Sequence, residues 1–357
     1  MTTHLLLSQN SSNLKELDDK SVNLIVTSPP YPMIEMWDEI FSEQDPTIKD
    51  ALLAGNGNTA FFKMHDLLNA VWDECDRVLK DNGFACINIG DATRTIDGDF
   101  RLYSNHTRII DYFLNKGYSV LPDIHWRKQS NSPNKFMGSG MYPAGAYVTY
   151  EHEYILIFRK GGKREFKGSQ KELRQKSAFF WEERNIWFSD LWEIKGASQT
   201  IAKSKDTRER NASFPFEIPY RLINMYSAEG DTVLDPFTGL GTTNLAAMAS
   251  NRNSIGVDID SELLCLAVEN MKKSKATLNS IIDNRISNHL RFIDSLSDEK
   301  TDKCYRNNHH DFLVKTRQEI EIAIDKIANI EITPNGCTCS YEPYTSPRSF
   351  EQLTIPM

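Results

Sequence analysis

No stretch of the sequence approaches the roughly 20 consecutive apolar residues that are needed to cross a bilayer. The first residues, MTTHLLLSQNSSN, also lack the basic start and the long apolar segment of a secretory signal. We therefore expect a cytoplasmic protein that does not contact membranes. With 357 residues, of which 40% are hydrophobic and 25% charged, the chain is long enough for one large globular domain or two smaller ones.

Cysteine is scarce, and it does not form the paired motifs of a zinc site. Three of the six cysteines lie in apolar stretches, which predicts reduced core residues: Cys75, Cys86 and Cys265. Cys337 and Cys339 form a C-x-C pair with two histidines upstream, but no second pair supplies the remaining zinc ligands. We expect no metal site.

Positive charge is in deficit over the whole chain, because the net charge is −8. This deficit argues against a protein that coats nucleic acid. Residues 126–210, however, hold 17 Lys and Arg against 10 Asp and Glu. A basic middle segment on an acidic body is typical of a localised contact with a polyanion. Charge alone fits a lysine-rich surface loop equally well.

The stretch LIVTSPPYP, residues 24–32, combines a strand with an unusual ending. Its first three residues predict a strand of a parallel sheet that is buried on both faces. Pro29 and Pro30 fix φ and remove two N–H donors, so the strand must end there. The end then offers the Ser28 hydroxyl, free carbonyl groups and the aromatic face of Tyr31. Such a set can hold a flat ring that bears an amino group, although a plain proline-terminated strand fits the same residues.

A second strand end lies in residues 230–260, GDTVLDPFTGLGTTNLAAMASNRNSIGVDID. A short strand, a glycine turn and a helix follow one another, an arrangement that points helix N–H groups at a ligand. The next strand ends at Asp258, 23 residues after Asp235, where an acidic residue typically accepts hydrogen bonds from ribose hydroxyls. The turn holds Gly239 and Gly241 but lacks the third glycine of the dinucleotide pattern G-x-G-x-x-G. These features predict a nucleoside-binding βαβ unit.

Further strands are predicted at residues 83–91, 120–128 and 152–160, and helical segments separate several of them. This alternation predicts an α/β fold with a mostly parallel sheet that helices cover on both faces. Ligands of such sheets bind beyond the carboxyl ends of the strands. Because both strand ends described above lie there, we expect them to share one cleft.

A TSPPY strand end together with a DPFTGLGTT loop resembles the S-adenosylmethionine-dependent amino methyltransferases of DNA. The order, with PPY before the glycine loop, is similar to their permuted beta group. Serine before the prolines resembles the cytosine-N4 branch of restriction–modification methyltransferases, since the adenine-N6 branch more often has aspartate or asparagine there. The resemblance covers roughly residues 4–275. It implies a Rossmann-like class I methyltransferase fold: a mixed, mostly parallel seven-stranded sheet with a circularly permuted motif order and a target-recognition insert.

The same resemblance implies a division of the chain. Residues 1–128 would form the catalytic half, and residues 206–275 the cofactor-binding half. Residues 129–205 would form a target-recognition region that includes a late sheet strand. Residues 276–357, which contain DFLVKTRQEIEIAIDKIANI, are expected to form a helical C-terminal extension.

For the cofactor, the resemblance implies a set of residues around S-adenosyl-L-methionine. The set is Gln9, Asp235, Pro236, Phe237, Gly239, Gly241, Thr242, Thr243 and Asp258. Gln9 departs from the family, because the matching strand usually ends in glycine and aspartate, and the aspartate contacts adenine. Glutamine keeps a carbonyl acceptor but loses the charge.

For catalysis, the resemblance implies the four residues Ser28, Pro29, Pro30 and Tyr31. An exocyclic amino group is a poor nucleophile because its lone pair is delocalised into the ring. The Ser28 hydroxyl and the Pro29 carbonyl would accept its hydrogens, and Tyr31 would stack on a base flipped out of the duplex. No covalent intermediate is needed. Methylation at carbon 5 of cytosine would need a cysteine after a proline, and the sequence has no such pair.

The partner would be double-stranded DNA with a specific recognition sequence, and a cognate restriction endonuclease would act separately. The candidate DNA contacts are Trp126, Arg127, Lys128 and Lys135. They belong to residues 125–145, which join basic, amide and glycine residues after a strand. Residues 161–205 are interpreted as a polar recognition insert, because Arg, Lys and Gln can contact phosphates and base edges.

Other functions fit part of the sequence. A nucleotide-binding oxidoreductase would account for the βαβ unit but not for TSPPY. An inactive DNA-binding relic would not need Ser28, Tyr31, Asp235 and Asp258 intact. Adenine-N6 transfer is the nearest alternative, because serine favours cytosine without requiring it.

Overall fold

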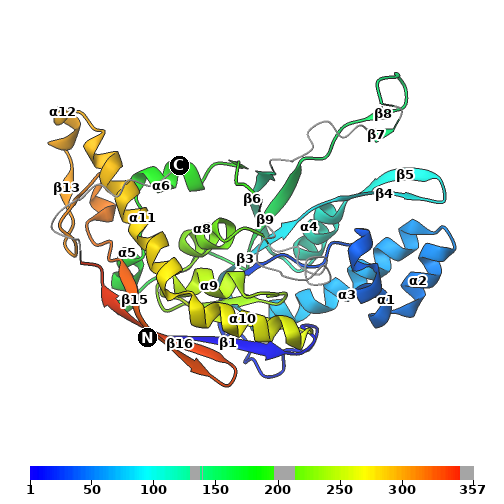
Figure 1. Cartoon of the computed structure of the whole chain (residues 1–357), viewed down its shortest axis with the longest axis horizontal. Coiled ribbons are helices and arrows are strands. Elements are labelled where there is room, and N and C mark those ends of the chain that lie inside the picture. Colours follow the sequence, from blue (N-terminus) through cyan, green and yellow to red (C-terminus); the bar gives the residue numbers. More distant parts are fainter. Residues whose placement is uncertain (129–136, 139, 197–213, 346–357) are drawn as a thin grey trace.

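A ten-stranded sheet runs through the centre of the protein in the computed structural model, which describes residues 1–128, 137–138, 140–196 and 214–345 (Figure 1). From one edge to the other, the strands are β10 (Leu191–Trp192), β6 (Ser119–Arg127), β9 (His152–Arg159), β3 (Leu79–Ile89), β2 (Val22–Thr27), β11 (Thr232–Asp235), β12 (Asn253–Asp258), β1 (Thr2–Ser8), β16 (Gly336–Pro343) and β15 (Asp325–Thr333). Neighbours from β3 to β1 are parallel, whereas β9 is antiparallel to β3 and β6.

The seven strands from β6 to β1 correspond to the predicted seven-stranded sheet, and three further strands widen it. β10 pairs in parallel with β6 at one edge, and the β15–β16 hairpin pairs antiparallel with β1 at the other. The sequence analysis missed β10 because it has only two residues. It missed the hairpin because the hairpin lies in a segment that we interpreted as helical.

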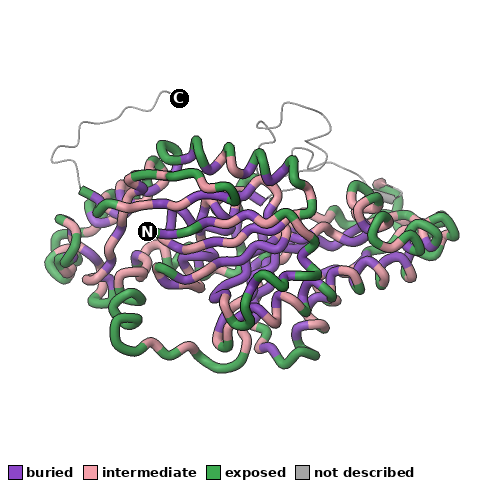
Figure 2. Tube along the Cα trace, turned by 90° about the horizontal axis from the view of Figure 1, so that it is seen from below, coloured by how far each residue is buried: buried purple, intermediate pink, exposed green. Residues whose placement is uncertain are grey.

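Helices cover both faces of the sheet, as predicted. In β2, Ile25 packs into the core on one face, whereas Leu24 and Val26 pack into the core on the other. The face of Ile25 is covered by α3 (Gly57–Val78) and α4 (Asn105–Asn115), and the opposite face by α8 (Glu217–Tyr226), α9 (Thr242–Met248) and α10 (Ser261–Lys273). Buried residues accordingly run through the middle of the protein between exposed outer turns (Figure 2).

Short elements complete the fold. They are η1 (Glu35–Trp37), α1 (Asp38–Gln44), α2 (Pro46–Leu53), β4 (Ala92–Ile96), β5 (Asp99–Tyr103), β7 (Met137–Gly138), β8 (Ala146–Tyr147), α5 (Ser169–Lys176), α6 (Trp181–Trp187), α12 (Asp298–Thr301), β13 (Tyr305–Arg306), β14 (Leu313–Val314) and η2 (Arg317–Glu319). The β4–β5 and β7–β8 hairpins project on the right of Figure 1, and α5, α12 and β13 lie on the left.

The prediction of a helical extension over residues 276–357 is wrong beyond α11 (Lys275–Asp294). The segment that follows contains mostly short strands and ends in the β15–β16 hairpin. In EIEIAI, residues 319–324, isoleucine recurs at every second position. Such a period, together with β-branching, favours a strand over a helix. Residues 319–324 themselves form the end of η2 and a turn, and β15 begins at the next residue, where Ile327, Ile330 and Ile332 continue the β-branched composition.

Among the described residues, no helix is long and apolar enough to cross a membrane. No cluster of three or more His, Cys, Asp and Glu side chains in that part of the chain could hold a metal ion.

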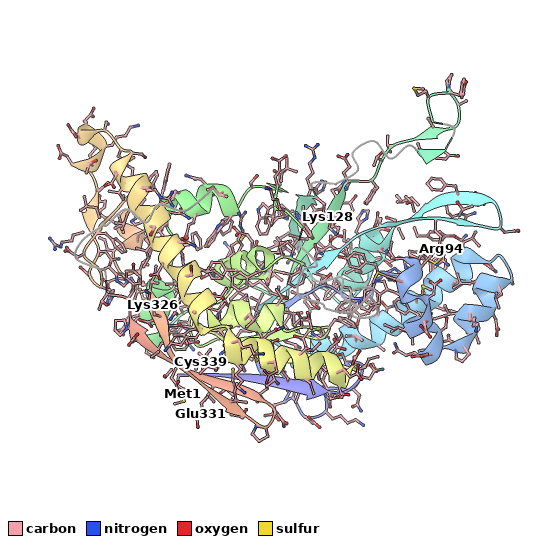
Figure 3. The ribbon with its side chains drawn as sticks, in the orientation of Figure 1. Met1, Arg94, Lys128, Lys326, Glu331 and Cys339 are labelled. Atoms are coloured by element: carbon pink, nitrogen blue, oxygen red, sulfur yellow. The ribbon has the colours of Figure 1, made fainter. Side chains whose placement is uncertain are left out.

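Cys75 and Cys86 are buried as predicted, whereas Cys265 is exposed on α10, so its assignment to the core is wrong. Cys337 and Cys339 of β16 are buried (Figure 3 labels Cys339).

Gly336 holds the C-terminal hairpin against β1. Its φ is +136°, and a Cβ atom there would collide with the carbonyl oxygen of His4. We expect Gly336→Ala to lower the free energy of unfolding by about 1–3 kcal/mol, measured by urea denaturation. Gly162→Ala is the matched control, because the nearest atom to its added Cβ lies 3.6 Å away. Equal stability of the two variants would contradict this account of the hairpin.

Candidate active site

Strand β2 ends where the sequence predicted. All six of its residues are buried, and the strand stops at Thr27, directly before Ser28 and the two prolines. The parallel neighbour β11 ends at Asp235, and β12, which is parallel to β11, ends at Asp258. The three strand ends therefore meet at one edge of the sheet, as expected for a parallel arrangement.

A pocket of about 150 Å³ lies at this edge, and both sequence motifs line it. Ser28 and Pro30 contribute from the end of β2. The loop after β11 and the end of β12 contribute the predicted residues Asp235, Pro236, Phe237, Gly239, Thr242 and Asp258. The structure thus brings two motifs that are about 200 residues apart in sequence into one pocket.

The remaining predicted residues do not line this pocket. Pro29 is buried. Gly241 is the N-cap of α9, with a φ of +80°, and a Cβ there would lie 3.2 Å from that of Ala267. Its role is therefore the close packing of α9 on α10. Thr243 points its hydroxyl to Asp235, at 2.6 Å.

The pocket also has an apolar wall that the sequence analysis missed. It is formed by Trp37, Ile40, Phe41, Leu67, Leu68, Val71 and Leu263. The first three belong to η1 and α1, which follow the PPY strand end directly. The sequence shows aromatic residues a few positions after PPY. It does not show in which direction the chain leaves the strand end, so these residues could not be assigned to the pocket.

Asp235 joins the two motifs to each other. Its Oδ1 accepts hydrogen bonds from the Thr27 hydroxyl at 2.6 Å and from the Phe237 N–H at 3.0 Å, and its Oδ2 accepts one from Thr243 at 2.6 Å. The side chain is only 3% exposed. This burial raises the pKa of Asp235 from 3.8 to about 6, because desolvation outweighs the hydrogen bonds to the charged form. Asp235 thus positions the end of β2 relative to the glycine loop.

The raised pKa of Asp235 predicts how stability depends on pH. A carboxyl whose pKa is higher in the folded than in the unfolded protein stabilises the fold at low pH, and this contribution disappears as the pH rises through the folded value. Relative to Asp235→Asn, the wild type should therefore gain stability as the pH falls from about 7 to about 4, by on the order of 1–3 kcal/mol. Urea denaturation of both proteins across this range measures the difference. If the free energies of unfolding of the two proteins changed with pH in the same way, the raised pKa of Asp235 would be contradicted.

Asp258 holds the glycine loop from the neighbouring strand. Its Oδ2 accepts a hydrogen bond from the Gly239 N–H at 2.9 Å, and its Oδ1 accepts one from the Asp260 N–H at 3.0 Å. Burial raises the pKa of this carboxyl, and the two N–H donors partly offset the effect. Each carboxylate oxygen retains a further lone pair for a ligand hydroxyl.

Gln9 lies next to Asp258, because its backbone N–H donates to the Asp258 carbonyl at 3.0 Å. Its side chain does not line the pocket. The Nε2 atom of Gln9 is buried and has no hydrogen-bond partner among the described residues. An orphaned buried donor is costly, so its position beside the pocket marks it as a group that a ligand can satisfy.

The Tyr31 hydroxyl points into a cluster of polar side chains next to the TSPPY strand end. Tyr31 Oη lies 3.0 Å from Ser28 Oγ, accepts a hydrogen bond from Asn88 Nδ2 at 2.7 Å, and donates one to Glu153 Oε2 at 2.9 Å. Burial raises the pKa of Tyr31 well above its usual value of 10, so the hydroxyl keeps its proton. Since that proton goes to Glu153, Ser28 is the donor in its bond to Tyr31. Ser28 Oγ also accepts a long hydrogen bond from Asn88 Nδ2, at 3.4 Å, which leaves its other lone pair for a ligand.

Asn88 and Glu153 are part of the site, and the sequence analysis did not identify them. They lie on β3 and β9, and Asn88 Nδ2 also donates to Glu153 Oε2 at 2.7 Å. Both are buried, at 2% and 7% exposure. The only indication in the sequence was that the charged residue Glu153 directly precedes the apolar stretch YILIF. The sequence did not show which strand end this residue would face.

The four candidate DNA contacts have different surroundings. Trp126 is 2% exposed and donates its indole N–H to the carbonyl of Ile194, so its assignment to DNA binding is wrong: its large ring packs in the core. Lys128 forms an ion pair with Glu153 at the active-site edge (Figure 3). Arg127 is exposed and lies 3.4 Å from Glu193. Lys135 lies outside the described residues.

The basic segment after β9 does not adjoin the pocket. β9 is antiparallel to β3, so it begins beside the pocket with Glu153 and ends at Arg159 on the opposite edge of the sheet. The chain continues there through α5 and α6. Residues 163–184, which we interpreted as part of a recognition insert, are therefore separated from Ser28 by the length of the sheet.

Comparison with known proteins agrees with this geometry. The sequence model of the DNA methylase family, N6_N4_Mtase, matches residues 22–269. The chain is 52% identical over 326 residues to the type II methyltransferase M.MthZI of Methanothermobacter thermautotrophicus, with 90% of each chain covered. It is 50% identical over 277 residues to the type II methyltransferase M.MjaI of Methanocaldococcus jannaschii, which covers 73% of this chain and 89% of that protein.

A solved structure supports the same assignment. The chain is similar to TTHA0409 of Thermus thermophilus, a DNA modification methylase whose crystal structure holds S-adenosyl-L-methionine. The TM-score is 0.56, with 29% identity over 75% of this chain and 94% of that one. The expected fold and cofactor are confirmed. The chain belongs to the DNA methylase family and is an S-adenosyl-L-methionine-dependent DNA methyltransferase of the type II restriction–modification class.

Proposed function

We propose that the protein methylates the exocyclic N4 amino group of cytosine in a flipped-out base, within a specific sequence of double-stranded DNA. The observation that carries the proposal is that Ser28 and Pro30 line the same pocket as Asp258 and the glycine loop. Serine before the two prolines supports cytosine as the target. A cognate restriction endonuclease that acts separately would complete the system.

The pocket fits the cofactor by the chemistry of its residues. Asp258 of the pocket offers carboxylate lone pairs to ribose hydroxyls. Gln9, which follows β1 next to Asp258 but does not line the pocket, has a buried amide donor without a partner among the described residues. The neighbouring Ile259, which also lines the pocket, supplies an apolar contact. When bound, S-adenosyl-L-methionine supplies the methyl group.

Ser28 would act on the target amino group as a hydrogen-bond acceptor. Because Ser28 donates its own proton to Tyr31 and accepts a long hydrogen bond from Asn88, at 3.4 Å, its other lone pair is available to an amino hydrogen. Together with the Pro29 carbonyl, it would draw the nitrogen toward a tetrahedral geometry and localise its lone pair. The rigid prolines fix both acceptors before the base arrives, so positioning is the main contribution to the rate.

The Tyr31 hydroxyl sets the direction of the Ser28 proton. We therefore expect Tyr31→Phe to lower kcat by about 10-fold with little change in cofactor affinity, because Ser28 loses its acceptor and can turn its proton toward the base. This expectation differs from stacking alone, for which phenylalanine would suffice. Tyr118→Phe is the control, since it removes a tyrosine–carboxyl hydrogen bond to Asp76 elsewhere. Full activity of Tyr31→Phe would leave only the aromatic face as its role.

The DNA contacts near the pocket are part of the same proposal. Arg127 and Lys128 lie at the carboxyl end of β6, on the edge of the sheet that carries the pocket. We propose that they contact phosphates near the target base. The same proposal extends to Lys135, which lies outside the described residues. Their ion pairs with Glu193 and Glu153 would rearrange when DNA binds.

Nucleoside mass spectrometry tests the proposed reaction. Genomic DNA is incubated with the protein and isotopically labelled S-adenosyl-L-methionine, then digested to nucleosides. We expect labelled N4-methylcytosine. Labelled N6-methyladenine alone would overturn the choice of base, and the absence of both would overturn transfer to DNA amino groups.

A further inference from the structure

A second and larger groove opens at the edge of the sheet opposite the active-site pocket. Its volume is about 1130 Å³. It is lined by Asn23 at the start of β2, by Arg159 at the end of β9, and by residues 224–228 at the end of α8. Ser28 follows the other end of β2. The groove is therefore separate from the site described above, and the proposed reaction gives it no role.

The groove carries an excess of positive charge. Eight Lys and Arg residues line it, against three carboxylates. The carboxylates are already engaged: Asp81 pairs with Lys20 at 2.6 Å, Glu321 pairs with His309 at 3.2 Å, and Glu319 is 2% exposed. Four cations of the groove form no ion pair with a carboxylate of the described residues: Lys163, Lys171, Arg174 and Arg184. These four charges are available to an anionic ligand.

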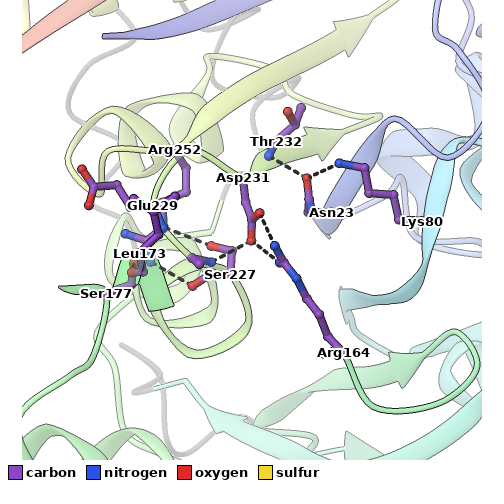
Figure 4. A network of polar contacts seen from close by, with 12 residues as sticks. Asn23, Lys80, Arg164, Leu173, Ser177, Ser227, Glu229, Asp231, Thr232 and Arg252 are labelled. Carbon is purple, nitrogen blue, oxygen red and sulfur yellow. Dashed lines mark hydrogen bonds and ion pairs between the residues drawn. The ribbon is translucent and has the colours of Figure 1, made fainter. Parts of the chain in front are cut away.

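The basic wall is fixed to the sheet before any ligand binds. Arg164 forms two hydrogen bonds to the Asp231 carboxylate, at 2.5 and 2.9 Å (Figure 4). The Ser177 hydroxyl donates to the carbonyl of Leu173 at 2.6 Å and accepts the N–H of Glu229 at 2.8 Å. These bonds attach α5 and the preceding loop to the start of β11. A preformed groove loses little entropy on binding.

Aromatic rings lie between the cations. Trp181 is 42% exposed, and Phe84, Phe179 and Tyr226 are partly exposed in the groove. The ring of Phe166 contacts the guanidinium groups of two arginines of the same wall. Phe84 and Tyr226 pack on each other, and Trp181 stacks on Phe292, so Trp181 is the ring that offers an exposed face. Basic side chains around an exposed ring are typical of surfaces that bind single-stranded nucleic acid, because phosphates contact the cations and an unpaired base stacks on the ring.

We infer that this groove binds a single strand of nucleic acid, at a second site separate from the duplex that is methylated. An acidic peptide would use the cations but not the rings. The groove, at about 1130 Å³, is somewhat larger than the pockets that bind small ligands, which have volumes of about 300–1,000 Å³. An oligonucleotide uses both the charge and the exposed ring.

Binding is measured by the fluorescence anisotropy of a labelled oligothymidylate of about 12 nucleotides, with unlabelled duplex DNA in excess to fill the active-site cleft. We expect binding that weakens steeply with salt. The double variant Lys171→Glu with Arg174→Glu should weaken it by about 10-fold or more, as should Trp181→Ala. Lys272→Glu with Lys273→Glu, the same charge change on exposed positions of α10, should leave it unchanged.

Several outcomes would overturn the inference. Equal loss in the groove variant and the α10 variant would show that net charge alone attracts the strand. Displacement of the oligonucleotide by polyglutamate at an equal concentration of charge would favour a protein partner. A parallel loss of duplex methylation would make the groove part of the target interface. Unchanged methylation together with lost oligonucleotide binding supports the second site, whichever base is methylated.

Discussion

Replacing Ser28 with alanine should lower kcat for methyl transfer by about 10²-fold or more. The hydroxyl lies at the pocket with its proton directed to Tyr31, so the variant removes an acceptor that the amino group needs in the transition state. Cofactor affinity should stay nearly constant, because no contact of Ser28 among the described residues holds the glycine loop. This combination of low kcat and unchanged cofactor Kd is the signature of a lost transition-state contact. Single-turnover kinetics and calorimetry measure the two quantities.

Ser21→Ala provides the matched control for this result. Ser21 precedes the same strand at its other end, and its hydroxyl donates to the carbonyl of Asp18 at 2.7 Å. The control therefore removes one serine hydroxyl next to β2 without touching the pocket, and we expect wild-type kinetics. If Ser28→Ala retained wild-type kcat, the TSPPY stretch would be only a proline-terminated strand end. If it lost cofactor binding as well, Ser28 would have to be reassigned to the cofactor half.

The central part of the fold was predictable because local sequence determines it. Leu24, Ile25 and Val26 form a strand that is buried on both faces, and the two prolines that follow cannot continue its hydrogen bonding. Gly241 marks the turn into α9, since few other residues adopt its left-handed backbone. The sharing of one pocket followed from the parallel order of the strands. The strand end and the glycine turn are each determined within a few residues, and the shared pocket then follows from the general geometry of parallel sheets.

The polar cluster under Tyr31 was not predictable in the same way. Asn88 and Glu153 lie 57 and 122 residues after Tyr31, and they meet it only because β3 and β9 pair in an antiparallel register. That register depends on the whole sheet. Trp126 misled the interpretation for the same reason: its basic neighbours indicated a surface, while its own alternate position on β6 faces the core. Even where a strand was predicted correctly, the structure was needed to show which face of the sheet each of its residues occupies.

For the basic segment, the sequence analysis identified the excess of positive charge correctly but did not show on which edge of the sheet it lies. Its excess of Lys and Arg was visible in the sequence, and the cations Lys163, Lys171 and Arg174 do form one surface. We interpreted that segment as a recognition insert because Arg, Lys and Gln can contact phosphates and base edges. An antiparallel strand, however, carries the chain to the far edge of the sheet. The direction of one strand thus changes the function that the segment can have.

Asp258→Ala should weaken binding of S-adenosyl-L-methionine by about 10- to 100-fold, because hydrogen bonds from ligand hydroxyls to a buried carboxylate contribute about 1.5–3 kcal/mol. The variant also frees the Gly239 N–H, so the glycine loop loses its anchor. Asp258→Asn keeps one carbonyl acceptor and the shape of the side chain, so we expect a smaller loss, of about 10-fold. Titration calorimetry with the cofactor alone measures both values.

Binding of duplex DNA separates this role of Asp258 from a general loss of structure. Asp258 lies at the end of β12, two strands away from Ser28, so duplex affinity should change by less than about twofold in the Asn variant. Glu262→Gln, on the first turn of α10, is the control for a removed negative charge, since Glu262 is exposed and does not line the pocket. Equal losses of cofactor and duplex affinity in Asp258→Asn would mean that the carboxylate maintains the whole edge of the sheet. A selective loss of cofactor affinity would place the ribose at Asp258, and therefore the methyl donor between the glycine loop and the TSPPY strand end.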